Sequence, residues 1–398
     1  MNASDLFTRI ASQPPLACLP PQLRGFLRDY LSHESARRFD GRWVINTQFP
    51  PYPSPAFENL CEHFVGGEEG SHRLYSVTWA VTNRCGFSCW HCYNAGRRQQ
   101  DVSLADSQRI ARRLQDLGAC MVTLTGGEPL LRQDLEEIAA AFGERVCVVV
   151  GTTGWGLTAA RAEALRQAGV FAIGVSLDSA VATEHDRLRG RPGAFCAALE
   201  ALGHAAAAGL YPYVVAVATR EFLERRRFFD FLEFVRGCGA LEVHLLEPVA
   251  AGRLSGCPEV LLTDAERRLC IQYQREVARR EDLPTLSTFT YLESPEAFGC
   301  GAGRTHVYID GSGELCPCNL VPLSFGNVAR EDLAQVLDRM TTSFPRPRCT
   351  CVGRALAGRV PEGPLPTAPE ASVRICREHL SSIEPLPRFF RARLRVPA

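Results

Sequence analysis

Three cysteines in one short segment carry the clearest chemical signal in this sequence. Cys85, Cys89 and Cys92 are separated by three and then two residues. Thiolates with this spacing can hold three irons of a [4Fe–4S] cluster and leave the fourth iron without a protein ligand. Zinc is the competing metal, but a structural zinc site needs four ligands. His91 could be the fourth, although its position between Trp90 and Cys92 is hard to reconcile with the same metal, so the spacing favours a cluster.

A second group of cysteines lies in the last quarter of the chain. Six of the 17 cysteines fall there: Cys300, Cys316, Cys318, Cys349, Cys351 and Cys376. Eight others are scattered singly and are expected to be small buried hydrophobic residues. Disulfide scaffolds are usually short secreted domains, whereas this chain has 398 residues and no visible export signal. The clustered cysteines are therefore interpreted as metal ligands.

Composition excludes several other kinds of chemistry. The 44 basic and 44 acidic residues cancel, which gives no support for a nucleic-acid or membrane-surface partner. The chain has no lysine, so Schiff-base chemistry, a lysine general base and a phosphate-binding P-loop are excluded. The longest stretch without Asp, Glu or Arg, residues 201–219, is interrupted by His204, Gly209 and Pro212 and is not expected to span a membrane. We predict a cytoplasmic location.

The elements that must position the cysteines alternate along the middle of the chain. Apolar, β-branched segments predict strands over residues 75–82, 121–125, 146–150, 170–176, 213–218 and 241–246. Amphipathic segments predict helices over residues 104–117, 131–142, 158–168, 195–208 and 225–238. Six strands that alternate with helices predict an α/β fold with a parallel sheet, either open and doubly wound or a partial barrel. Ligands bind at the carboxyl ends of such strands, and the first cysteine group directly follows the first strand.

The two flanking regions have a different character. Residues 1–70 are predicted to be irregular and punctuated by proline, with one helix over residues 23–31. Beyond residue 282 the chain is rich in Pro, Gly and Cys, and a β-hairpin is predicted over residues 305–315, turning at Asp310-Gly311. This tail has too little apolar surface for a core of its own, so metal ligation is the expected source of its order. The chain is thus divided into residues 1–70, 71–282 and 283–398.

The first cysteine segment resembles the radical S-adenosylmethionine (radical SAM) superfamily. Cys85, Cys89 and Cys92 match the CxxxCxxC motif of that family, and Tyr93 is the aromatic residue that commonly follows it. The resemblance extends from about residue 75 to residue 253, with further motifs in the family's order. It implies that the fourth iron of the cluster binds the amino and carboxylate groups of SAM.

The GGEP motif of the family is matched after the second predicted strand. Here the residues are Gly126, Gly127, Glu128 and Pro129. Glycines let exposed backbone approach the methionine part of SAM, and a glutamate can accept a hydrogen bond from its ammonium group. The same residues also suit a plain strand-to-helix turn, with proline in the first turn.

Three later segments extend the resemblance. Thr152-Thr153-Gly154 occupies the family's polar segment after the third strand, and Ser176-Leu177-Asp178 resembles the SLD segment near the ribose and carboxylate of SAM. Arg189 could pair with the SAM carboxylate or could simply be solvated. Glu247-Pro248 with Gly252-Arg253 resembles the segment after strand six. The resemblance implies these SAM contacts: Tyr93, Gly126, Gly127, Glu128, Pro129, Thr153, Ser176, Asp178 and Arg189.

The C-terminal cysteines resemble the SPASM or twitch extension of the same superfamily. Cys300 precedes Ile309-Asp310 and Gly313, and then Pro317-Cys318, as in the opening segment of that extension. The second half departs from the pattern, which leaves two auxiliary clusters in doubt. One auxiliary [4Fe–4S] cluster is implied on Cys300, Cys318, Cys351 and Cys376, with Cys316 and Cys349 as alternates. A zinc-stapled tail is the alternative.

The resemblance implies a partial (β/α)6 barrel that cleaves SAM to methionine and a 5′-deoxyadenosyl radical. An external one-electron donor of the flavodoxin or ferredoxin type would supply the electron, and the auxiliary cluster would make the outcome oxidative. The implied substrate is a ribosomally made peptide or a cofactor precursor such as a tetrapyrrole, and residues 1–70 could recognise the substrate or a leader peptide. The alternative is a non-catalytic iron–sulfur carrier or scaffold, which would not need the GGEP and SLD segments.

Overall fold

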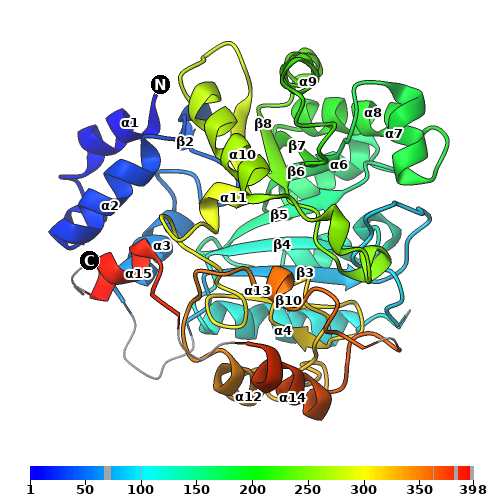
Figure 1. Ribbon diagram of the computed structural model, residues 1–398. Helices are drawn as coiled ribbons and strands as arrows, with labels where there is room; N and C mark the ends of the chain where they lie inside the picture. The colour runs from blue at the N-terminus through cyan, green and yellow to red at the C-terminus, as the bar shows by residue number, and fades with distance from the viewer. Residues whose placement is uncertain (67–72, 99, 362, 381–383, 395–398) are drawn as a thin grey trace.

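A computed structural model describes residues 1–66, 73–98, 100–361, 363–380 and 384–394 (Figure 1). All six strands predicted for the middle of the chain are present. They are β3 (Ser76–Thr82), β4 (Met121–Gly126), β5 (Cys147–Thr152), β6 (Val170–Ser176), β7 (Tyr211–Val217) and β8 (Glu242–Leu246). Each pairs in parallel with the next, as expected for strands connected by helices.

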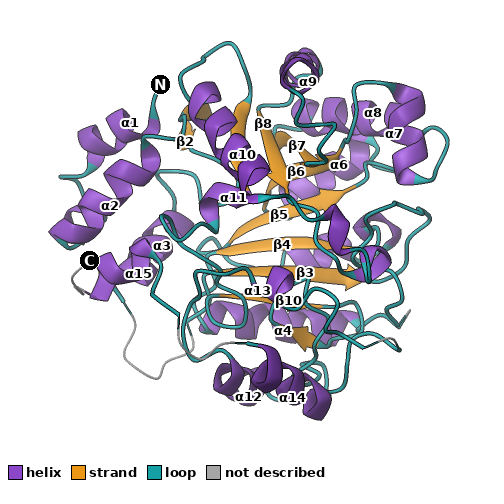
Figure 2. Cartoon of the chain, in the orientation of Figure 1, coloured by secondary structure: helices purple, strands orange, loops and turns teal. Residues whose placement is uncertain are grey.

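Helices connect these strands and cover one face of the sheet (Figure 2). They are α4 (Leu104–Asp116), α5 (Leu135–Ala139), α6 (Ala159–Gln167), α7 (Ala182–Arg189), α8 (Ala194–Ala207) and α9 (Arg225–Gly237). The helix predicted over residues 131–142 is shorter than expected, because the 3₁₀ turn η2 (Pro129–Leu131) precedes α5. Strand residues such as Val122, Val150 and Val214 pack against the helices, whereas their neighbours Met121, Val149 and Tyr213 face the other way.

The sheet is longer than predicted and does not close into a complete barrel. Its nine strands follow the order β11-β10-β3-β4-β5-β6-β7-β8-β9. After α10 (Asp264–Val277), β9 (Thr285–Thr288) adds in parallel to β8, and α11 (Phe289–Leu292) follows it. At the other edge, β10 (His306–Ile309) adds in parallel to β3, and β11 (Leu315–Cys316) pairs antiparallel with β10. The predicted hairpin is confirmed, and it places the C-terminal region beside the strand that leads into Cys85.

The N-terminal segment is more regular than predicted. It contains α1 (Ala3–Ile10), α2 (Pro21–Leu31), the strand pair β1 (Arg37–Phe39) and β2 (Arg42–Val44), and α3 (Pro55–Val65). Pro21, one of the prolines interpreted as breaks, is instead the first residue of α2, where a missing N–H costs no hydrogen bond, and Pro55 begins α3 in the same way. The backbone N–H and hydroxyl of Thr47 donate to the Glu242 carboxylate at the start of β8, at 2.9 and 2.8 Å. This segment therefore covers the amino ends of the strands, away from the cysteines.

The C-terminal region also has a core, contrary to the expectation that metal alone would order it. Beyond the hairpin lie α12 (Leu333–Ser343), α13 (Val352–Ala355), α14 (Pro369–His379) and α15 (Arg388–Leu394). Phe325, Leu337 and Phe344 are buried in the same hydrophobic cluster as the outer face of the sheet. Apolar packing therefore orders much of this region. No helix within the described ranges is long and apolar enough to cross a membrane.

Candidate functional site

The first cysteine group lies on the loop at the carboxyl end of β3. In the sheet β3 lies between β4 and β10. Cys85 is the most exposed of the three thiols, Cys92 is half-buried and Cys89 is buried. Partial burial, together with the charges of Glu128, Cys89 and Cys92, raises the pKa of Cys85 to about 11. The three thiols are thus close enough to interact, and binding a cluster to them would release protons.

Backbone hydrogen bonds from distant segments hold this loop. The N–H groups of Ser88 and Trp90 donate to the carbonyls of Arg189 and Leu188 at the end of α7, both at 3.1 Å. The Arg253 N–H donates to the Cys92 carbonyl at 2.9 Å. The segment after β8, the sixth predicted strand, thus holds the last cysteine through its backbone.

The GGEP turn packs directly against the cysteine loop. The Gly127 N–H donates to the Thr82 carbonyl at 2.8 Å, and the Glu128 N–H donates to the Arg84 carbonyl at 2.9 Å. A Cβ on Gly127 would lie 2.1 Å from the Arg84 carbonyl oxygen, and one on Gly126 would lie 2.1 Å from the Thr82 oxygen. Besides the predicted approach to SAM, the structure gives these glycines a steric reason of its own: they let two backbone segments touch.

Gly127→Val is therefore expected to damage the cluster site and SAM binding together. The added side chain collides with the backbone of residues 83 and 84, which must shift and displace Cys85. Iron in the anaerobically reconstituted protein should fall towards about four per chain, the content of one auxiliary cubane. The matched control is Gly203→Val on α8, where a Cβ meets nothing within 4 Å. Full iron content with weaker SAM binding in Gly127→Val would instead support a purely SAM-contacting role.

Glu128 links the GGEP turn to the end of β5. Its buried carboxylate accepts hydrogen bonds from the Leu130 N–H, the Thr152 hydroxyl, and both the N–H and the hydroxyl of Thr153, at 2.6–3.0 Å. Burial raises its pKa above the ordinary value, while these donors oppose the shift. A hydrogen bond from the SAM ammonium group would require one threonine hydroxyl to turn away, so this predicted contact remains a proposal.

The predicted residues Asp178 and Arg189 form an ion pair beside the cysteines. Arg189 Nη2 lies 2.9 Å from Asp178 Oδ2, and both side chains are buried. Arg189 Nη1 also lies 3.9 Å from the Cys89 Sγ. Burial raises the pKa of Cys89, and the Arg189 charge opposes that rise. Arg189 is therefore not a solvated loop residue, since it stabilises negative charge at the cluster position.

The other predicted SAM contacts surround the same loop. Pro129 begins η2, Thr153 follows β5 and Ser176 ends β6. The ring of Tyr93 packs edge to face on Tyr308 of β10, with centroids 6.0 Å apart. All of these residues lie at carboxyl ends of strands or on the loop itself, as a parallel sheet requires.

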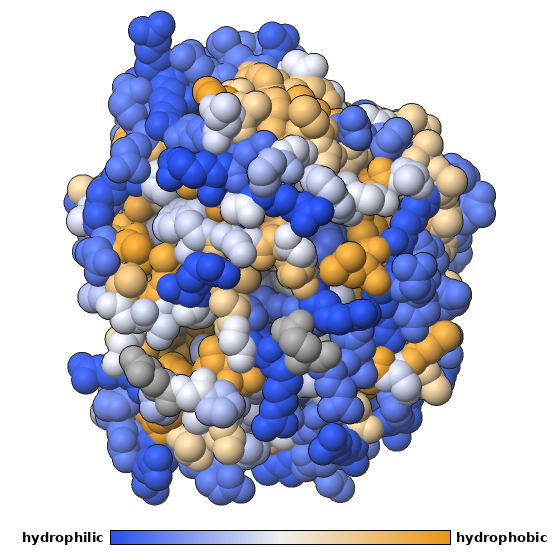
Figure 3. Space-filling view, turned by 90° about the vertical axis from the view of Figure 1, so that its right-hand side faces the viewer, coloured by the Kyte–Doolittle hydropathy of each residue, from blue (hydrophilic) through white to orange (hydrophobic). Residues whose placement is uncertain are grey.

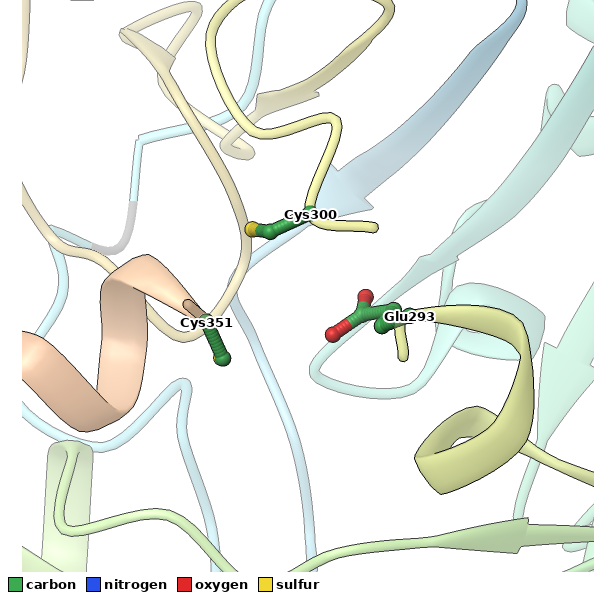
Figure 4. A group of neighbouring side chains, drawn as sticks. All are labelled: Glu293, Cys300 and Cys351. Atoms are coloured by element: carbon green, nitrogen blue, oxygen red, sulfur yellow. The ribbon is translucent and has the colours of Figure 1, made fainter. Parts of the chain in front are cut away.

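A second group of metal-ligating side chains gathers where the C-terminal region meets β9 and α11. One ligand atom each from Glu293, Cys300 and Cys351 lies within 4.8 Å of the others (Figure 4). Cys300 exchanges backbone hydrogen bonds with Arg348, at 2.8 and 3.2 Å, which brings it beside Cys351. Burial raises the pKa of Cys318, and the charges of Glu293 and Cys351 add to that rise, so Cys318 lies in the same region although it is not in the group of Figure 4.

The other three C-terminal cysteines have different surroundings. Cys376 is buried on α14 near the side chains of Ser343 and Arg348, and is not in the group of Figure 4. The Cys349 thiol donates to the Pro385 carbonyl at 3.2 Å. The Cys316 sulfur lies 3.9 Å from Arg97 Nη1. The structure thus gathers two of the predicted ligands, Cys300 and Cys351, with Cys318 near enough for their charges to interact, and it leaves Cys376, Cys316 and Cys349 outside.

Sequence reasoning missed Glu293 and Arg97. Glu293 precedes Cys300 by seven residues and matches no part of the cysteine pattern. Arg97 is a buried arginine whose side chain lies 3.4 Å from Asp310 and stacks on Tyr308. Nothing in the local sequence separates it from the other arginines of the chain.

The ligand sets of the two cysteine groups suit iron or zinc, because most of the ligand atoms in both groups are thiolates.

A cavity of about 300 Å³ lies between the two groups of cysteines. Its walls include Gly96 beyond the cysteine loop, Gly252 beyond β8, Leu320 after Cys318, and Gly353 after Cys351. The described residues that line it are small or apolar, and none is charged. Figure 3 views the side towards which β3 points, where apolar patches are scattered among polar residues. The cavity could accommodate a substrate between two cofactor sites.

Comparison with known proteins places this arrangement in a family. The model of the radical SAM superfamily matches residues 79–220, and that of SPASM, an iron–sulfur cluster-binding domain, matches residues 300–351. The mycofactocin maturase MftC of Mycobacterium ulcerans is 30% identical over 275 residues, covering 66% of this chain and 72% of that protein. The AdoMet-dependent heme synthase of Nitratidesulfovibrio vulgaris is 24% identical over 295 residues, covering 68% and 80%.

Solved structures agree on the fold. Streptococcus suis SuiB bound to its precursor peptide SuiA superposes with a TM-score of 0.58 at 18% identity, covering 72% of this chain and 70% of that one. The AdoMet-bound enzyme anSMEcpe superposes with a TM-score of 0.54 at 12% identity, covering 81% and 100%.

The chain belongs to the radical SAM superfamily. Within it, the chain is one of the enzymes that carry a SPASM extension. Its cofactors are SAM with a [4Fe–4S] cluster and an auxiliary iron–sulfur cluster. The partial-barrel fold class and the family resemblance are confirmed, and the alternative of a non-catalytic carrier is not supported.

Proposed function

We propose that the chain oxidises a carboxylate-bearing cofactor precursor of the tetrapyrrole class in the cavity between its two cysteine groups. Cys85, Cys89 and Cys92 would hold the SAM-cleaving cluster. The observation that carries the proposal is the lining of the cavity, which combines segments adjacent to both groups. A substrate held there would meet the radical source on one side and an electron acceptor on the other.

When bound, SAM and its cluster would supply radical chemistry that removes one hydrogen atom from a substrate, and an auxiliary cluster would supply an acceptor for the second electron of a two-electron oxidation. The chain's residues position these partners. The GGEP turn and α7 hold the cysteine loop, the Asp178–Arg189 pair balances charge beside Cys89, and the apolar walls exclude water. The predicted SAM contacts and an external flavodoxin- or ferredoxin-type donor are part of this proposal. The proposal also includes a reducing compartment, such as the cytoplasm, as the place where the chain acts.

Two arginines next to the cavity lining suit a substrate with carboxylate groups. Arg253 adjoins Gly252 and Arg359 adjoins Gly358, both of which line the cavity. Both arginines are exposed, and neither forms an ion pair with another described residue. Guanidinium groups bind carboxylates through paired hydrogen bonds. An apolar cavity whose lining segments continue into exposed arginines favours an apolar ring system that carries acidic side chains.

The names of relatives support the same class. Three relatives named AdoMet-dependent heme synthase match 65–68% of this chain at 24–28% identity.

The N-terminal segment lies at the amino ends of the strands, on the opposite side from the cysteine loop. That position favours a structural role for residues 1–70 over leader-peptide recognition at the active site.

The test is substrate-dependent formation of 5′-deoxyadenosine. Reconstituted enzyme, SAM and dithionite are incubated anaerobically with iron-coproporphyrin, with a porphyrin that lacks carboxylates, or with no addition. We expect iron-coproporphyrin alone to stimulate 5′-deoxyadenosine formation and to lose mass. Arg253→Gln should raise the KM for iron-coproporphyrin about tenfold, which is the effect of one lost charge-assisted hydrogen bond. The control Arg330→Gln, at an exposed position, should leave this KM unchanged.

A ribosomally made peptide is the second candidate, favoured by the 30% identity to the maturase MftC. A short peptide encoded beside the gene for this chain is the appropriate probe. Stimulation of 5′-deoxyadenosine formation by that peptide, together with no response to iron-coproporphyrin, would contradict the tetrapyrrole proposal.

A further inference from the structure

We propose that Glu293 is a ligand of the auxiliary cluster together with Cys300, Cys318 and Cys351. It takes the place of Cys376, the fourth ligand that the family resemblance implied. The inference rests on the auxiliary cluster within the proposed function and is independent of the substrate. A carboxylate oxygen would then bind one iron, and three thiolates would bind the others.

The fold holds Glu293 and Cys300 together through a tight loop. Glu293 follows α11, and its N–H donates to the Phe289 carbonyl at 2.8 Å. The chain then turns back, because the N–H groups of Phe298 and Gly299 donate to the carbonyls of Leu292 and Ser294, both at 3.1 Å. This loop brings Cys300 towards the Glu293 side chain. In Figure 4 the Glu293 carboxylate and the Cys300 thiol point into the space beside Cys351.

The Glu293 carboxylate has no other partner in the part of the chain that the structure describes. It is half-buried, and it makes no hydrogen bond or ion pair with a described residue. Arg267, whose charge acts on Glu293, is already paired, since it lies 3.0 Å from the Glu247 carboxylate. Removing a carboxylate from water without a partner is unfavourable, and it remains unfavourable when the neighbouring thiols lose their protons and become thiolates. Binding to iron would satisfy it.

Cys376 is held in a different environment. It lies on α14, which packs against α12, and its thiol is buried near Ser343 and Arg348. Ligation by Cys376 would require this packed helix to move. Ligation by Glu293 requires only that side chains open around the cluster, because its carboxylate already lies within 4.8 Å of the Cys300 and Cys351 thiols.

The experiment isolates the auxiliary cluster in full-length protein that carries Cys85→Ala, Cys89→Ala and Cys92→Ala. In this background we compare Glu293→Ala, Glu293→Cys and Cys376→Ala. The control is Glu296→Gln, which alters an exposed carboxylate on the same loop. Iron and zinc contents are measured after anaerobic reconstitution and again after mild oxidation, and Mössbauer spectra distinguish an oxygen-ligated iron from thiolate-ligated ones.

We expect about four irons in the background, in Cys376→Ala and in the control. Glu293→Ala should lose the oxygen-ligated signal and about one iron of four on oxidation. Glu293→Cys should keep all its iron and show only thiolate ligation, which a merely structural glutamate would not produce.

Iron loss in Cys376→Ala, with four irons and an unchanged spectrum in Glu293→Ala, would overturn the proposal and restore Cys376 as the ligand. Stoichiometric zinc in place of iron would also overturn it. Because no substrate is present, neither result depends on the tetrapyrrole assignment. Conversely, failure of iron-coproporphyrin to react would leave these spectra unaffected.

Discussion

No 5′-deoxyadenosine is expected from protein that carries Cys85→Ala, Cys89→Ala and Cys92→Ala together. These thiols are the only ones on the loop after β3, and without them SAM has no iron to bind. Iron should fall from about eight per chain to about four, because the auxiliary cluster remains. The assay combines anaerobic incubation with SAM and dithionite, chromatography for 5′-deoxyadenosine, and iron determination on the same sample.

Three cysteines outside both groups provide the control for this variant. Cys18 and Cys196 are exposed and Cys238 is half-buried, so their joint replacement by alanine should leave iron content and SAM cleavage unchanged. Continued SAM cleavage in the Cys85, Cys89 and Cys92 variant would show that the active cluster is bound elsewhere.

Arg97→Met is expected to lower the free energy of unfolding by about 3–5 kcal/mol, the usual cost of removing one partner of a buried ion pair. The side chains of Arg97 and Asp310 are both 0% exposed and lie 3.4 Å apart. The Arg97 guanidinium also stacks on the Tyr308 ring at 4.8 Å and approaches the Cys316 sulfur at 3.9 Å. Without Arg97, the Asp310 charge stays buried beside only polar donors. Urea unfolding measures the loss.

Because Arg97 joins the cysteine loop to β10 and β11, the same variant should also hold its clusters less tightly. Adding Asp310→Asn should recover part of the stability, since the uncompensated charge is then gone. The exposed pair Arg226–Asp230 is the control, with side chains 88% and 68% exposed, and Arg226→Met should change little. An Arg97→Met protein as stable as the parent would show that the pair contributes no net stability.

The sequence was most informative where the ligands are neighbours in the chain. Cys85, Cys89 and Cys92 lie within eight residues, so any loop that carries them keeps them close. The strands were also predictable, because continuous apolar segments flanked by amphipathic helices bury both faces of a parallel sheet. The order of the motifs followed from that topology, since each ends a strand on the same edge of the sheet.

Long-range contacts were not predictable in the same way. The reason why Gly127 must be glycine is the carbonyl of Arg84, more than forty residues earlier in the chain. Arg189 was equally consistent with a solvated loop until its pairing with Asp178 was known. In the N-terminal segment, proline was interpreted as a break because the first turn of a helix and an irregular segment accept it equally well.

By itself, then, the sequence determined the family and the six-stranded parallel core and supplied the candidate for the first cluster site, because local spacing and periodicity constrain all three. Only the tertiary structure decided which C-terminal side chains meet. Cys300 and Cys351 come together with Glu293, and Cys318 lies near them, because β10 pairs with β3 and Cys300 pairs with Arg348, whereas α14 keeps Cys376 elsewhere. Spacing cannot predict such a set, since residues fifty positions apart become neighbours only through the packing of everything between them.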